Sequence, residues 1–164
     1  MIAWDIRSKE ERTLLNPAFC ATLLWSAATG HKLFNSLLSV EETFLVLPLV
    51  LPEITRQSLP RDMRTSVPIW IEKNPIEQQK IAKRARATVP FTKAALLFAG
   101  VHGLLQFNGH DVVPSEQWSK GIKKLLPRTS DEVRLCTAKA EFVGKWFAKT
   151  GNSATVLALM GVRP

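Results

Sequence analysis

The first strong pattern in the chain is residues 17–29, an apolar run that contains no charged side chain. Asn16 followed by Pro17 is typical of a helix start, because asparagine caps free N–H groups and proline fits the first turn. Gly30 is typical of a helix stop. A helix that is uncharged on every side must be buried on most of them. The pattern therefore predicts a helix at the centre of the core or of an interface.

The middle of the chain has a second helix signal, which is followed by prolines. Ser39 stands three residues before Glu42, the spacing of a capping box, so a helix is predicted from about residue 40. The apolar run 44–52 contains Pro48 and Pro52, and each proline removes a helical hydrogen bond. We expect one kinked helix or two short helices there, and then a loop over 58–68.

Two helices and a hairpin are predicted next. Asn74-Pro75 starts a helix that runs to about residue 88, Pro90 ends it, and a further helix is predicted over 93–103. Asn108-Gly109 separates two short apolar runs, which predicts a hairpin with a two-residue type I′ turn.

That order of helix, turn, helix and hairpin is typical of a winged-helix domain, with the helix from residue 40 as its first helix. We assign the winged-helix-like region to about 39–113. Residues 94–101, in the recognition position, are almost wholly apolar, so we do not expect this helix to read DNA bases.

A helical extension is predicted over about 114–164, beginning with a basic linker. Thr129 and Ser130 cap a long helix over 131–149, and Gly151 ends it. One apolar seam of this helix follows helical spacing and is assigned to the core: Val133, Cys136, Ala140, Val143 and Phe147. A second strip is assigned to a partner, with Trp146 as its anchor: Leu135, Phe142 and Trp146. Burial of both strips by the chain itself is the alternative.

The tail 153–164 is uncharged until Arg163, so we expect it to be docked on this chain or on a partner. With 164 residues, the chain is predicted to form a single domain. Its fold class is mainly α with a small β-hairpin, a winged-helix-like core and a long C-terminal helix.

Positive charge is concentrated in two segments of a chain whose formal net charge is +8. Residues 78–93 and 117–128 contain bases and no acid. Such patches fit DNA phosphates or an acidic protein surface, and a merely solubilising role is the alternative. The candidate binding residues are Lys80, Lys83, Arg84, Arg86, Lys120, Lys123, Lys124 and Arg128.

The sequence carries no recognisable catalytic or cofactor motif. Phosphate-binding loops are absent, and His31, His102 and His110 lack metal-ligand spacing with each other and with Cys20 and Cys136. We expect no catalysis, metal or cofactor. The longest uncharged apolar stretch is shorter than the roughly 20 residues of a membrane span. A cytoplasmic protein without a membrane partner is expected.

Several stretches together resemble a known family. They are RTLLNPAFCATLLWSAATG (12–30), EETFLVLPLVLP (41–52), LPRDMRTSVPIWI (59–71), LLPRTSDEV (125–133) and AEFVGKWFAKTGNSATVLALMGVRP (140–164). The chain resembles the small middle component of bacterial three-component ABC systems, such as the small subunit of Lamassu-type antiphage systems. The similarity covers nearly the whole chain and involves packing and capping residues.

The resemblance implies a non-catalytic adaptor in an antiphage or plasmid defence complex. Such a subunit joins an SMC/Rad50-like ABC ATPase to a nuclease-like effector and restrains the effector until double-stranded DNA is sensed. The family supplies no residue-level binding motif. A free-standing winged-helix DNA-binding regulator is the alternative function.

Overall fold

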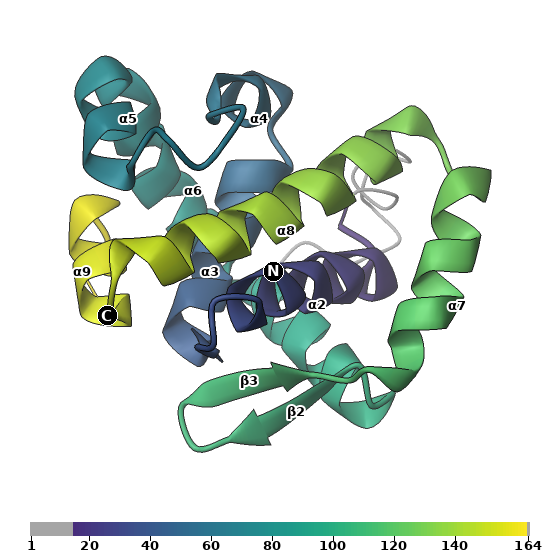
Figure 1. The fold of residues 1–164 in the computed structure, drawn as a ribbon. Helices are drawn as coiled ribbons and strands as arrows, with labels where there is room; N and C mark the ends of the chain where they lie inside the picture. The colour runs from purple at the N-terminus through teal and green to yellow at the C-terminus, as the bar shows by residue number, and fades with distance from the viewer. Residues whose placement is uncertain (1–14, 164) are drawn as a thin grey trace.

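Helix α2 (Pro17–Lys32) lies at the centre of the fold in the computed structural model, which describes residues 15–163 (Figure 1). The Asn16 side chain accepts a hydrogen bond from the Ala18 N–H (2.8 Å), which confirms the predicted start. Most of the uncharged helix is buried. It packs against the sheet and against three helices, α3 (Val40–Val50), α6 (Pro75–Val101) and α8 (Asp131–Thr150). The predicted stop at Gly30 is wrong, because the helix continues through this glycine for two more residues.

Gly30 has a packing role instead. It faces helix α8 (Asp131–Thr150), where a Cβ atom at Gly30 would lie 2.1 Å from the Glu141 carbonyl oxygen. In the same helix pair, a Cβ at Gly144 of α8 would lie 1.9 Å from the carbonyl oxygen of Ala27 in α2. Real Cβ atoms essentially never approach another atom within 3.0 Å. Both glycines therefore allow the backbones of α2 and α8 to touch.

The proline-rich middle forms three helices, α3 (Val40–Val50), α4 (Glu53–Ser58) and α5 (Val67–Lys73). The capping box of α3 is confirmed, with Ser39 and Glu42 bonded to each other's backbone N–H groups. Pro48 lies inside α3, and α4 starts directly after Pro52. This agrees with the expected division of the segment into helical pieces.

Helix α6 (Pro75–Val101) is continuous, so the predicted break at Pro90 is wrong. Pro90 is exposed, and the carbonyl that loses its helical donor belongs to Arg86, which is also an exposed residue. Buried residues on both sides of the proline, Ala85 and Ala95 among them, keep the helix against the core. Without a turn at residue 90, the helix–turn–helix predicted over residues 75–103 is not formed, and the winged-helix-like core stays a prediction.

A three-stranded antiparallel sheet has the order β1-β3-β2. The hairpin strands are β2 (Leu105–Asn108) and β3 (Asp111–Pro114), and β1 (Leu38–Ser39), which the sequence did not predict, pairs with β3. Asn108 pairs with Asp111, so the loop is Gly109-His110, one residue later than predicted. Gly109 has a φ of 62°, whereas His110 does not have a positive φ, and a type I′ turn requires both.

The predicted basic linker is largely helical, forming α7 (Gln117–Leu125) and a short 3-10 turn, η2 (Leu126–Arg128), at the edge of the fold (Figure 1). Helix α8 follows, capped by Ser130 and ended at Gly151, as predicted. The tail forms α9 (Ser153–Leu159), whose Val156 and Leu157 are buried in this chain. The buried hydrophobic side chains form one cluster, and the fold is confirmed as mainly α with a small β element.

Candidate interaction surfaces

The basic residues of α6 divide into two groups. Lys80 donates to Glu77 (2.8 Å), and Arg84 donates to Thr55, whose hydroxyl donates to the same carboxylate (2.6 Å). Hydrogen bonds from Lys80 and then from Thr55 hold the pKa of the nearly buried Glu77 below its ordinary value. Lys80 and Arg84 therefore neutralise a carboxylate of their own domain. Lys83 and Arg86 are exposed, and no acid of the described residues pairs with them.

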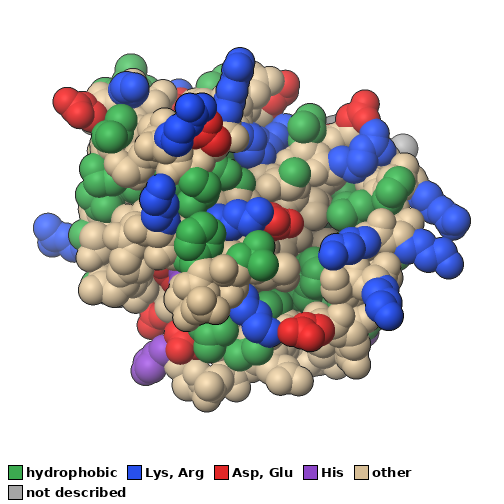
Figure 2. Space-filling model, in the orientation of Figure 1, with side chains coloured by type: hydrophobic (Ala, Val, Ile, Leu, Met, Phe, Trp, Pro, Cys, Tyr) green, Lys and Arg blue, Asp and Glu red, His purple; other side chains and the backbone are tan. Residues whose placement is uncertain are grey.

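The second basic segment forms a separate surface on α7 and η2. Lys120, Lys123, Lys124 and Arg128 are all exposed, and among residues 15–163 no carboxylate forms an ion pair with any of them. Lys and Arg side chains gather over α7 at the right-hand edge of Figure 2. Ile122 holds α7 to the core, with its side chain buried. The structure thus gathers these four predicted residues on one side of the molecule.

The strip assigned to a partner on α8 is not one surface. The outward placement of Trp146 is wrong, because its side chain is only 1% exposed. The indole N–H donates to the Thr65 carbonyl (2.8 Å), and the ring meets Trp70 of α5 edge to face at 5.6 Å between centroids. Trp146 is therefore covered by α5 and by the loop before it. For this residue, the alternative that the chain buries its own second strip is correct.

Phe142 and Leu135 lie differently along the same helix. Phe142 is half-buried, with Lys139 Nζ 5.2 Å from its ring centroid, and that lysine also donates to the Pro60 carbonyl. Leu135 is exposed near the start of the helix. The predicted inner seam is confirmed at four positions, which are fully buried, with Val133 half-buried: Cys136, Ala140, Val143 and Phe147.

An apolar surface that the sequence analysis missed lies where the end of α6 meets β2. Leu97, Val101 and Phe107 are 70%, 73% and 50% exposed. They line a shallow groove of about 420 Å³ together with Leu96 and Gly100. A Cβ at Gly100 would meet the Phe107 ring at 3.0 Å, so the ring lies directly over the helix. We name Leu97, Val101 and Phe107 the apolar patch. Clustered exposed apolar side chains of this kind are typical of protein interaction sites.

The signal for this patch was present in the sequence. Leu97 and Val101 are four residues apart, which puts them on one helical face, whereas Ala95 and Ala99 lie on another. All four are apolar, so the sequence could not show which pair faces the core. The apolar patch and the basic surface of α7 are suited to binding, and neither brings together groups for acid–base or nucleophilic chemistry.

A buried ionisable pair connects α2 and α3. His31 Nε2 is 3.8 Å from Glu42 Oε2, and both side chains are almost completely buried. Burial raises the pKa of Glu42, against the hydrogen bonds from Ser39 that lower it. No group of three or more possible metal ligands comes together in the described part of the chain. Cys20 and Cys136 are both buried, and burial raises the pKa of their thiols to about 12 and about 11.

The comparison with protein families covers nearly all of this structure. The model of the ABC-three component (ABC-3C) system Middle Component 3 family matches residues 4–164. The chain belongs to this family. The resemblance found in the sequence is confirmed to this extent, and the Lamassu-type subtype stays a prediction. No curated protein and no solved structure matches the chain significantly.

As a middle component, the chain belongs to a system with further ABC components, which are its expected partners. This agrees with a role in a multi-component assembly. None of the helices within residues 15–163 of the middle component combines the length and the apolar character needed to cross a bilayer.

Proposed function

We propose that this middle component is a non-catalytic adaptor in a cytoplasmic antiphage or plasmid defence complex of the Lamassu type. It joins an SMC/Rad50-like ABC ATPase to a nuclease-like effector and restrains the effector until DNA is sensed. Membership in the ABC-3C middle-component family is the observation that carries this proposal, because it implies partner components. The apolar patch supports it, since an adaptor needs a surface that a partner can cover.

Co-expression with the ATPase and effector components of the same system tests the adaptor role. We expect the three proteins to purify together, and the effector to cleave DNA without a trigger when the middle component is left out. Leu97→Asp with Val101→Asp should release one partner, because each carboxylate would have to be desolvated in the interface. Ile76→Asp is the matched control, since Ile76 is a comparably exposed apolar residue at the other end of α6.

The outcomes separate the two parts of this proposal. Unchanged assembly with the double variant would mean that the apolar patch is not the interface with a partner. Absence of any complex among the three wild-type components would contradict the adaptor role itself.

We also propose that the basic surface of α7 contacts the phosphates of DNA held by the complex. Three exposed cations on α7 and one on the adjoining turn η2, none of them paired with a carboxylate among residues 15–163, support this proposal. Replacing Lys120, Lys123, Lys124 and Arg128 with Ala should weaken DNA binding equally for unrelated sequences and reduce the salt slope by about one unit per lost contact. Loss of assembly with unchanged DNA affinity would show that the surface meets an acidic subunit instead.

A further inference from the structure

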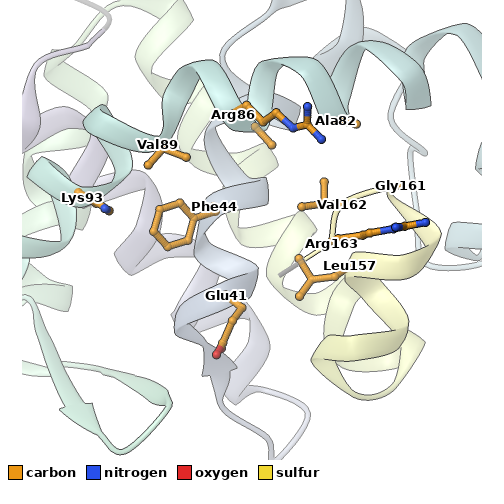
Figure 3. Close-up of a pocket in the computed structure, with 11 residues that line it drawn as sticks. Glu41, Phe44, Ala82, Arg86, Val89, Lys93, Leu157, Gly161, Val162 and Arg163 are labelled. Atoms are coloured by element: carbon orange, nitrogen blue, oxygen red, sulfur yellow. The ribbon is translucent and has the colours of Figure 1, made fainter. Parts of the chain in front are cut away.

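A pocket of about 370 Å³ lies between α3, α6 and the segment that follows α9. Its apolar lining includes Phe44 of α3, Val89 of α6, and Leu157 and Val162 from the C-terminal region. Figure 3 shows these side chains around one space, with Phe44 and Val89 on one side and Leu157 and Val162 on the other. The three surrounding segments are far apart in the sequence, so the pocket exists only in the folded chain.

The rim of this pocket is positively charged. Arg86, Lys93 and Arg163 all line it, and within residues 15–163 no carboxylate forms an ion pair with any of the three. Glu41 also lines the pocket, but its carboxylate lies 3.5 Å from His110 Nδ1 of the hairpin. In Figure 3 it lies across Phe44 from Arg86. Positive charge therefore exceeds negative charge beside an apolar space.

The contrast with the start of α6 makes this arrangement informative. There, Lys80 and Arg84 are held by Glu77 and belong to the domain's own ion-pair network. At the pocket the three cations have no carboxylate partner among residues 15–163. An occupant that complements this site would bring both apolar surface for the lining and carboxylates for the rim.

We propose that the pocket binds an amphipathic segment of a partner component of the system. A large apolar side chain of that segment fills the space beside Phe44, and neighbouring carboxylates pair with Arg86 and Arg163. A volume of about 370 Å³ is near the lower end for ligand pockets and suits one or two anchoring side chains. This inference rests on the proposed function, because it requires that the chain assembles with partner proteins.

Photo-crosslinking in the assembled complex identifies the occupant directly. Benzoylphenylalanine is placed at Val89, inside the pocket, and in a separate variant at Lys83, which is exposed on the same helix outside the lining. From position 89 we expect a cross-link to a partner segment that has an Asp or Glu within about four residues of a large apolar residue. From position 83 that segment should not be labelled.

A synthetic peptide of the cross-linked segment then tests the charges. Its Kd for the full-length chain, measured by fluorescence anisotropy, should rise at least about tenfold in the variant Arg86→Glu with Arg163→Glu. The control Lys83→Glu should change the Kd less than about twofold, since an exposed charge outside the pocket contributes little. Both variants alter exposed side chains, and circular dichroism checks that they fold.

Each outcome decides the proposal. A complex that forms without a cross-link from position 89, or with a labelled segment that lacks acids, would overturn the pocket assignment and leave the adaptor role intact. Binding of dodecanoate that depends on Arg86 and Arg163, with no peptide binding, would mean that the pocket takes a small anionic amphiphile. Failure of the wild-type complex to form would remove the proposed function and this inference with it.

Discussion

Replacing Gly144 with Ala tests the contact between α2 and α8 in the centre of the fold. The new methyl carbon would lie 1.9 Å from the Ala27 carbonyl oxygen, a backbone atom that cannot rotate away. An ordinary contact begins at 3.4 Å, so the methyl carbon and the carbonyl oxygen must move apart by at least about 1.5 Å. The two helices must separate to allow this, because side chains already fill the space around them.

The cost of that separation follows from dispersion between the packed side chains. A gap of about 0.5–1 Å forfeits a quarter to a half of each contact's attraction. Four seam residues of α8 are fully buried, and a loss of about 0.5–1 kcal/mol at each gives about 2–4 kcal/mol. Alanine's better helix propensity offsets about 0.5–1 kcal/mol of this. The separation that this overlap requires is wider than about 1 Å, so we expect a net destabilisation of at least about 1–3 kcal/mol.

Urea unfolding followed by far-UV circular dichroism measures this difference. The control is Gly121→Ala in α7, because a Cβ at Gly121 meets nothing within 4 Å. The control should gain about 0.5–1 kcal/mol from helix propensity alone. The two glycine-to-alanine changes are thus expected to have opposite signs in the same protein.

A second measurement addresses the separation of the helices. Gly30→Ala creates a similar overlap with the Glu141 carbonyl, so the double variant should lose less than the sum of the two single losses. If Gly144→Ala stabilises the protein as much as Gly121→Ala does, the reasoning from backbone contact is refuted.

Three further predictions concern buried polar groups. Because burial raises the pKa of Glu42, ionisation of this carboxyl opposes folding. In urea unfolding, Glu42→Gln should therefore be more stable than wild type near about pH 8 and should lose this advantage toward about pH 4. An advantage that grows on acidification would contradict this. Trp146→Ala should cost about 3–5 kcal/mol in the same assay, since it removes a buried indole. An unchanged unfolding midpoint together with lost assembly would instead mean that Trp146 faces a partner, as the sequence predicted. Arg56→Met should cost about 3 kcal/mol, because the buried guanidinium donates to the Val50 carbonyl (2.8 Å) and to Glu132 (2.7 Å). In thermal melts, Arg56→Lys should recover part of the stability that Arg56→Met loses.

Local signals in the sequence predicted the helix starts well. Asn16, Ser39 and Ser130 each cap a helix with a side chain that reaches a backbone N–H two or three residues later. Capping depends on neighbours along the chain, so the sequence contains all of the information needed. The same holds for the existence of the hairpin, although not for its register, which pairing of β3 with β1 and β2 decides.

Predictions that depended on distant parts of the chain were less accurate. Pro90 would end an isolated helix, but in the fold it lies on the exposed face while residues on both sides of it are buried. Trp146 is covered by Trp70 and the loop carrying Thr65, about eighty residues away, and no helical periodicity reveals such a cover.

The candidate binding residues show the same division. Counting charges over 78–93 found the cations but left out Glu77, which lies one residue before the segment and engages two of them. The apolar patch was hidden because residues 94–101 of α6 are all apolar, and only the packing of that helix shows which side stays outside.

The glycine contacts between α2 and α8 also limit how this protein can move. A slide of α8 along α2 by one turn, about 5.4 Å, would bring Ala140 or Ala148 to the place of Gly144. Each carries a methyl group that the site cannot hold, so the two helices cannot ratchet past each other without separating. Force applied along the axis of one helix is therefore transmitted to the other, because neither can slide past its neighbour.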